Sequence, residues 1–127
     1  MAGIEKVGEL TRRQIRLDSS NVPVISNNVK FKAAGKYPYG TVVVIKKTDG
    51  EPVAEKYVSD SYTAAAGDVF GIVSDNQNIE VTDTPVIGNV YLSGVFAKDA
   101  IEEITGKISK GDEIVMNAQL IIFSKHL

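Results

Sequence analysis

The chain has 127 residues, of which 43% are hydrophobic and 24% charged, and its formal net charge is −2. This length and apolar content fit one globular domain with one core. Cysteine is absent and the single histidine is His126, so the sequence offers no disulfide, thiolate nucleophile or histidine-based metal site. The acidic balance argues against a nucleic-acid partner, and neither a membrane-spanning run nor a signal-peptide pattern is found. We expect a protein made in the cytoplasm, with no nucleic-acid or membrane partner.

Residues 1–36 differ in charge from the rest of the chain. All three arginines lie in this segment, and residues 1–37 carry a net charge of +4, against −6 for residues 38–127. Pro23 and the asparagine pair after it interrupt the apolar pattern, so no stable element is indicated. We therefore expect residues 1–36 to form a flexible or extended N-terminal arm.

The candidate partner-binding part of this arm is the stretch 12–17. Polar Gln14 and Arg16 alternate with apolar Ile15 and Leu17, which would give an extended strand one polar and one apolar face. Guanidinium groups make forked bonds to carboxylates and carbonyls, which the ammonium group of lysine does not. We predict docking on a partner by β-strand addition, through Arg12, Arg13, Gln14, Ile15, Arg16 and Leu17. A solvated stretch of a disordered tail is the alternative.

Two tyrosines, Tyr37 and Tyr39, flank Pro38 just before the first strong strand pattern. Packing over the end of the core is one interpretation. A subunit contact is the other, because tyrosine buries a large area at a small entropy cost and is enriched at interfaces.

From Tyr37 onward the sequence predicts a single β-rich domain, residues 37–127. The β-branched run 41–45 and the return run 52–58 flank the turn signal Asp49–Gly50, which predicts a hairpin. Further strands are predicted within 67–75, 78–85, 89–96 and 119–124. Their spacing is typical of a small, compact β-barrel or sandwich.

One short helix is predicted at residues 97–107, where four apolar residues share one face and Gly106 stands at the C-cap position. The linker 107–115 is then expected to return the chain to strand through a turn at Gly111 and Asp112.

No constellation in the sequence predicts catalysis. The glycines at 67 and 71 lead into a strand pattern with no nearby cation, unlike a phosphate loop, and the polar residues at 75–78 match only part of a calcium loop. The acidic pairs Glu102–Glu103 and Asp112–Glu113 are adjacent residues, which are typical of a solvated face and not of a general acid and base across a cleft. We expect no enzyme activity, no cofactor and no bound metal.

Four stretches in order, "YPYGTVVVIKKTDGE", "AAAGDVFGIVSDN", "VIGNVYLSGVFAKDAI" and "GDEIVMNAQLIIF", resemble the lambda-type head decoration proteins of tailed phages. The matching positions are Gly40, Thr41, Gly71, Ile72, Asp75, Val90, Gly94, Phe96 and the last apolar strand within 114–123. The resemblance implies a β-rich subunit that trimerises on the outside of the expanded phage head. It also implies an N-terminal arm that orders against the shell of major capsid protein, and no catalytic residue.

We therefore expect a virion protein, made in the host cytoplasm, that stabilises the capsid as a homotrimer. Three arms in one trimer would bind together more tightly than one arm alone. Three alternatives remain open at this point: another phage head or tail accessory protein, a small trimeric β-fold enzyme, and a cytosolic binding module.

Overall fold

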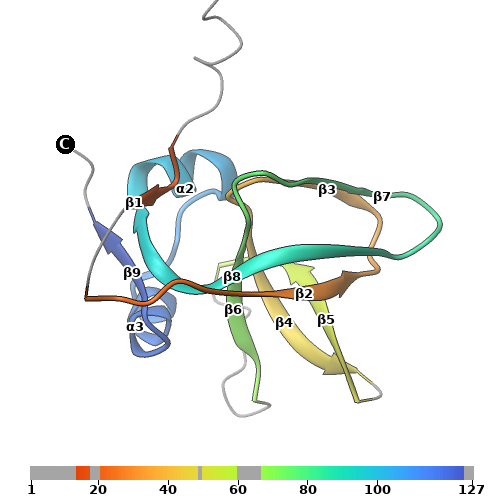
Figure 1. Ribbon diagram of the computed structural model, residues 1–127, viewed down its shortest axis with the longest axis horizontal. Helices are drawn as coiled ribbons and strands as arrows, with labels where there is room; N and C mark the ends of the chain where they lie inside the picture. The colour runs from red at the N-terminus through yellow and green to blue at the C-terminus, as the bar shows by residue number, and fades with distance from the viewer. Residues whose placement is uncertain (1–13, 18–20, 49, 60–66, 125–127) are drawn as a thin grey trace, which may run out of the picture.

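The computed structural model of the protein describes residues 14–17, 21–48, 50–59 and 67–124. Strands make up most of this part of the chain, and the helices come near its end (Figure 1). The strands are β1 (Arg16–Leu17), β2 (Ile25–Phe31), β3 (Gly35–Pro38), β4 (Val42–Thr48), β5 (Glu51–Lys56), β6 (Val69–Val73), β7 (Asn78–Val81), β8 (Val86–Ala97) and β9 (Ile121–Ser124). The helices are α2 (Lys98–Thr105) and α3 (Lys110–Ala118).

Five strands close into a barrel in the order β2-β5-β4-β6-β8, and β8 completes the ring by pairing with both β6 and β2. The pair β2–β5 is parallel and the other four pairs are antiparallel. The predicted hairpin at 41–58 is confirmed as β4–β5, with Gly50 in the left-handed region at φ +80°. The predicted mainly β architecture is confirmed, and it is a barrel.

The barrel interior is one of two apolar clusters. Alternate residues of the barrel strands point inward and are buried together, among them Val29, Phe31, Val43, Ala54 and Val90. The two-stranded ribbon β3–β7 adds Tyr37, Ile79 and Val81 to the same cluster. Space inside the barrel is limited. A Cβ placed on Gly88 would lie 2.2 Å from Ile79 Cδ1, and glycine avoids this clash because it has no Cβ.

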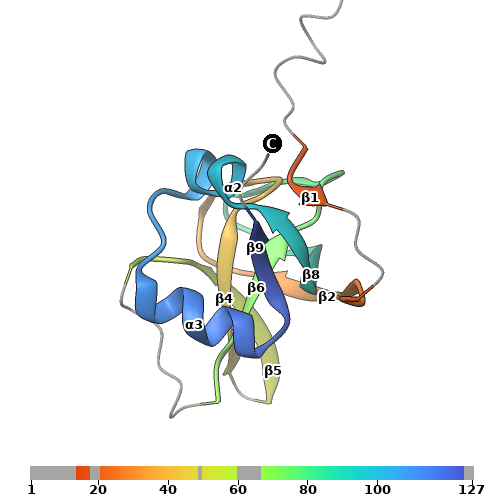
Figure 2. The ribbon, with the colours of Figure 1, turned by 90° about the vertical axis from the view of Figure 1, so that its left-hand side faces the viewer.

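The second cluster lies between the barrel wall and the helices (Figure 2). Here β8 bends at Gly94, whose φ of +144° favours glycine, and its last four residues pair with β9, while β1 pairs at residues 95–96. Helices α2 and α3 pack over this region, and Lys98 Nζ bridges them at 3.0 Å from Glu113 Oε1. The cluster includes Phe70, Ile72, Phe96, Ile101 and Met116.

The predicted helix at 97–107 is confirmed as α2, but the predicted return to strand across 107–115 is wrong. Residues 110–118 form α3, and the last strand is limited to β9. The Ser109 side chain accepts a 3.3 Å hydrogen bond from the Asp112 N–H and so caps the helix, while Met116 is fully buried beneath it. Capping and burial outweigh the weak helix propensity of this segment.

The arm predicted for residues 1–36 also differs from the structure. Strand β2 is seven residues long and pairs with β8 along its whole length, and Val29 and Phe31 fill the barrel interior. Burial of two such side chains stabilises the fold by about 1.5–3 kcal/mol each. Residues 14–17 also belong to the fold, as described below. Residues 1–13 lie outside the described residues.

Candidate functional site

The candidate partner-binding stretch runs along the last residues of β8. In β1, Arg16 pairs with Phe96 and Leu17 with Val95, in antiparallel register. The Ala97 N–H donates a 2.8 Å hydrogen bond to the carbonyl oxygen of Ile15. This stretch therefore pairs as a strand with β8 of the same chain, and docking on a partner by β-strand addition stays a prediction.

The apolar side of this stretch is buried in the protein's own core. Ile15 has no exposed surface, and Leu17 is half-buried against the same cluster. The prediction that Ile15 contacts a separate partner is therefore wrong, because the site formed by α2 and β8 takes up its side chain. Gln14 remains exposed, and its Nε2 donates a 2.9 Å hydrogen bond to the Arg16 carbonyl.

Arg16 is the one arginine among the described residues, and it faces the barrel. Its guanidinium carbon lies 5.9 Å from the ring centroid of Tyr91, close enough for a cation–π contact. The Tyr91 hydroxyl donates a 2.9 Å hydrogen bond to Asp75 Oδ1 in the turn after β6. Burial raises the pKa of Tyr91, and the hydrogen bond to Asp75 and its charge raise it further, while Arg16 acts in the opposite direction. This link fastens β1 to the barrel.

A second fastening holds the chain just before β2. The buried Ser93 hydroxyl donates a 2.7 Å hydrogen bond to the Pro23 carbonyl and accepts one of 3.1 Å from the Ile25 N–H. The register between β2 and β8 shifts at this point, which marks a β-bulge. The side chains of Val24 and Ile25 remain 46% and 52% exposed.

Val24 and a third exposed apolar residue, Leu120, have Gly94 as a common neighbour. A Cβ on Gly94 would be 3.8 Å from Val24 Cγ2, and the Gly94 N–H donates a 2.9 Å hydrogen bond to the Leu120 carbonyl. Leu120 is 46% exposed and has a left-handed φ of +69°, which is costly for a leucine at the end of a helix. We call Val24, Ile25 and Leu120 the Gly94 patch.

Tyr37 and Tyr39 lie in different surroundings in the structure. Tyr37 is 2% exposed, packs edge to face on Phe31 at 5.0 Å between ring centroids, and donates a 2.7 Å hydrogen bond to the Ala33 carbonyl. Burial raises its pKa, with a smaller contribution from Glu55. Tyr39 is half-buried against the outer cluster. For Tyr37 the core interpretation is therefore correct, because a side chain this buried has no surface left for a subunit contact.

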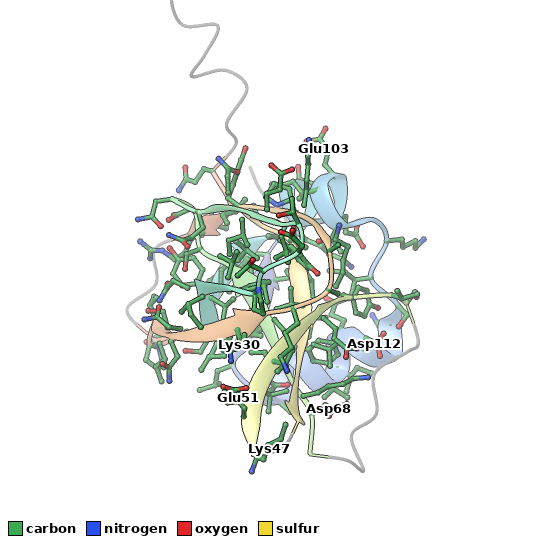
Figure 3. The ribbon with its side chains drawn as sticks, turned by 90° about the vertical axis from the view of Figure 1, so that its right-hand side faces the viewer. Lys30, Lys47, Glu51, Asp68, Glu103 and Asp112 are labelled. Carbon is green, nitrogen blue, oxygen red and sulfur yellow. The ribbon has the colours of Figure 1, made fainter. Side chains whose placement is uncertain are left out.

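The buried acidic group of α3 has a structural explanation. The Tyr57 hydroxyl donates a 2.5 Å hydrogen bond to Asp112 Oδ2 and accepts one of 3.3 Å from the Ser109 N–H. Asp112 thus lies inward, between α3 and the end of β5 (Figure 3). These bonds join the N-terminus of α3 to the residue that follows β5, so the group ties α3 to the barrel.

The described residues, 14–17, 21–48, 50–59 and 67–124, assemble no cluster of metal ligands. No group of three or more histidine, cysteine or acidic residues there lies close enough to hold a metal ion. A shallow groove on the β3–β7 ribbon is lined by Lys36, Pro38, Asn78, Ile79 and Glu80, which bring one cation and one carboxylate together. Among the described helices, none has the length and apolar character needed to cross a membrane.

Comparisons of the chain with protein-family models, with curated proteins and with solved structures found no match in any of the three. The fold and the site define a small closed β-barrel that carries two helices and an added N-terminal strand. The candidate site consists of the β1 attachment and the Gly94 patch. Sequence reasoning missed Tyr91, Ser93 and Leu120, because their neighbours Arg16, Pro23 and Gly94 are distant in sequence.

Proposed function

We propose that this chain is a structural protein of a tailed-phage virion that binds the outer surface of the expanded head as a trimer and stabilises the capsid. The observation that carries the proposal is the attachment of β1 to β8. This attachment holds Arg16 and Leu17 beside Phe96 and Val95, at one end of the barrel. The resemblance of the four sequence stretches to head decoration proteins supports the same function.

The burial of Ile15 narrows the part of the arm that would meet the shell. Residues 1–13, with Arg12 and Arg13, and the exposed Gln14 are the remaining candidates for the contact with major capsid protein. An arm of this length spans at most about 45 Å when extended, which is enough to reach across a neighbouring subunit. Guanidinium groups in it would bind carboxylates and carbonyls of the shell.

The Gly94 patch supports self-association. Its three apolar residues are each about half exposed. Their uncharged neighbours in the sequence include Pro23, Ser26 and Gln119. Copies related by a rotation axis bring like residues close together, so an uncharged surface avoids repulsion between identical groups. Within a trimer we assign the subunit contact to this patch.

The proposal is tested by mixing the purified protein with expanded, undecorated heads of the phage whose genome encodes it, and sedimenting the mixture. We expect saturable co-sedimentation in multiples of three copies and an increased resistance of the heads to heat. Electron microscopy with a label on this chain separates the runner-up, another head or tail accessory protein, by its location. Absence of the label from virions would overturn both the capsid-stabilising function and the runner-up.

A further inference from the structure

A trimer built through the Gly94 patch needs a second surface on each copy. In a closed ring of three copies every interface is head-to-tail, so two different surfaces of the chain meet at each interface. The counterpart of the patch has to be apolar and uncharged as well, because burying an unpaired charge against apolar side chains is costly. It also has to lie on the same side of the molecule, since copies joined through opposite sides form an open filament.

The described residues offer few candidates for this counterpart. Outside the patch, the large exposed hydrophobic residues among them are Val58, Val69, Ile87 and Ile114. Ile87 lies opposite Lys30 in the β2–β8 pair, so its surroundings are charged. Val58 and Val69 border residues 60–66, which lie outside the described part of the chain. Ile114, on α3, has surroundings that fit the requirement.

The outer face of α3 is uncharged from Gly111 to the end of the helix. Ile114 is 60% exposed, and the small residues Gly111 and Ala118 lie three and four residues from it on the same face, so the isoleucine protrudes. The two acidic residues of the helix point elsewhere, because Asp112 is buried and Glu113 is bonded to α2. We call Gly111, Ile114 and Ala118 the α3 face. A helix face turned to solvent is ordinarily polar or charged, so this face is suited to a contact.

Leu120 joins the α3 face to the Gly94 patch. Ile114 lies about 6 Å along the helix from Ala118, and Leu120 of the patch follows two residues later. Figure 2 shows α3 and the start of β2 on opposite sides of β9, and Figure 1 shows α3 and β9 together at one end of the molecule. Leu120 also keeps its apolar side chain at a left-handed position, φ +69°, that favours glycine or asparagine. A contact with another copy accounts for a leucine at this position.

We infer that the α3 face of one copy packs against the Gly94 patch of the next copy around a threefold axis. The occupant is a second copy of this chain, because the two surfaces match in being apolar and uncharged and because Leu120 makes them continuous. Three equivalent contacts of this kind close the ring. The inference rests on the proposed function, which supplies the trimer.

Cysteine cross-linking tests the contact in the full chain, which has no cysteine of its own. Ile25→Cys and a size-tagged Ile114→Cys are purified separately, mixed until subunits have exchanged, and oxidised. We expect a disulfide-linked heterodimer as the main product, because the two residues meet across the interface. Ile87→Cys in place of Ile25→Cys is the matched control. It should give about tenfold less heterodimer, since cysteines whose Cα atoms are more than about 7 Å apart are not bridged.

Ile114→Lys provides a second measurement. Sedimentation equilibrium should show the dissociation constant of the trimer rising on the order of tenfold or more, with an unchanged thermal melt because the side chain is exposed. A trimer that forms no Ile25–Ile114 link and tolerates Ile114→Lys would overturn the inference and leave the proposed function standing. A wild-type chain that stays monomeric at high micromolar concentration would also overturn it. Co-sedimentation with expanded heads then decides separately whether the proposed function fails as well.

Discussion

The Ala97 N–H donates a 2.8 Å hydrogen bond to the carbonyl of Ile15, and the side chain of that isoleucine is completely buried. The pair joins the N-terminal strand to the junction between β8 and α2. A stretch that the sequence assigns to a mobile arm is thus part of the core, and this changes which residues remain for a partner.

Replacing Ile15 with alanine should lower the free energy of unfolding by about 2–5 kcal/mol, because it removes a buried aliphatic side chain and leaves a cavity beside α2. Urea denaturation followed by circular dichroism measures the change. Gln14→Ala is the control, and it should alter stability by no more than about 0.5 kcal/mol, because Gln14 is exposed. Equal effects of the two substitutions would contradict the burial of Ile15.

Deletion of residues 1–13 should leave the protein folded, whereas deletion of residues 1–31 should abolish cooperative thermal unfolding. The longer deletion removes β2, and with it one of the five barrel strands and its pairing with both β5 and β8. The two truncated proteins are compared by thermal melts. A cooperative melt of the longer deletion would show that β2 is dispensable. The shorter deletion should also reduce co-sedimentation with phage heads if the proposed function is correct.

Gly88→Ala should destabilise the protein by about 1–3 kcal/mol, because the new Cβ would meet Ile79 Cδ1 at 2.2 Å and Phe31 Cε1 at 3.0 Å in the barrel. The matched control is Gly111→Ala in the first turn of α3, where a Cβ meets nothing within 4 Å. That change should stabilise the helix by up to about 1 kcal/mol. Chemical denaturation of both variants gives the sign of the change in the free energy of unfolding. An unchanged free energy in Gly88→Ala would contradict the packing between β8 and the β3–β7 ribbon.

Ile25→Lys should weaken self-association without changing the thermal stability of the subunit, since this side chain is 52% exposed in the Gly94 patch. Ile87→Lys is the control. Ile87 is 61% exposed on the same strand as Gly94, but seven residues away, about 23 Å along β8. Sedimentation equilibrium measures the oligomer. Dissociation by Ile87→Lys alone would place the contact elsewhere.

Stability should fall as the pH rises above about 10, the ordinary pKa of tyrosine. The folded protein raises the pKa of Tyr91 and Tyr37, chiefly through burial, so it holds their protons more firmly than the unfolded chain does. The resulting stabilisation is fully present below the unfolded pKa and is lost as the pH rises through the folded pKa. The loss as the pH rises above about 10, measured by urea titration, should be smaller in Tyr91→Phe. An unchanged pH dependence in that variant would show that Tyr91 does not contribute to the loss of stability.

Local pattern was enough to predict most elements of the domain. The β-branched run at 41–45 and the turn at Asp49–Gly50 specify β4–β5, because a hairpin joins residues that are close in sequence. Helix α2 follows from the spacing of its apolar residues and from Gly106 at its end. Helix α3 also had a local signal that was missed: Ser109 precedes Asp112 by three residues, the spacing of a helix cap.

Tertiary structure decided the rest, because the decisive contacts join distant parts of the chain. Strand β2 has polar, weakly patterned residues, and it becomes a barrel strand because β8, about sixty residues later, supplies its hydrogen-bond partners. Ile15 is buried because Gly40, Phe96 and α2 together form a site for it. Alternation in the sequence predicts that residues 14–17 have a polar and an apolar face. Only the folded chain determines that the apolar face packs against the protein's own core.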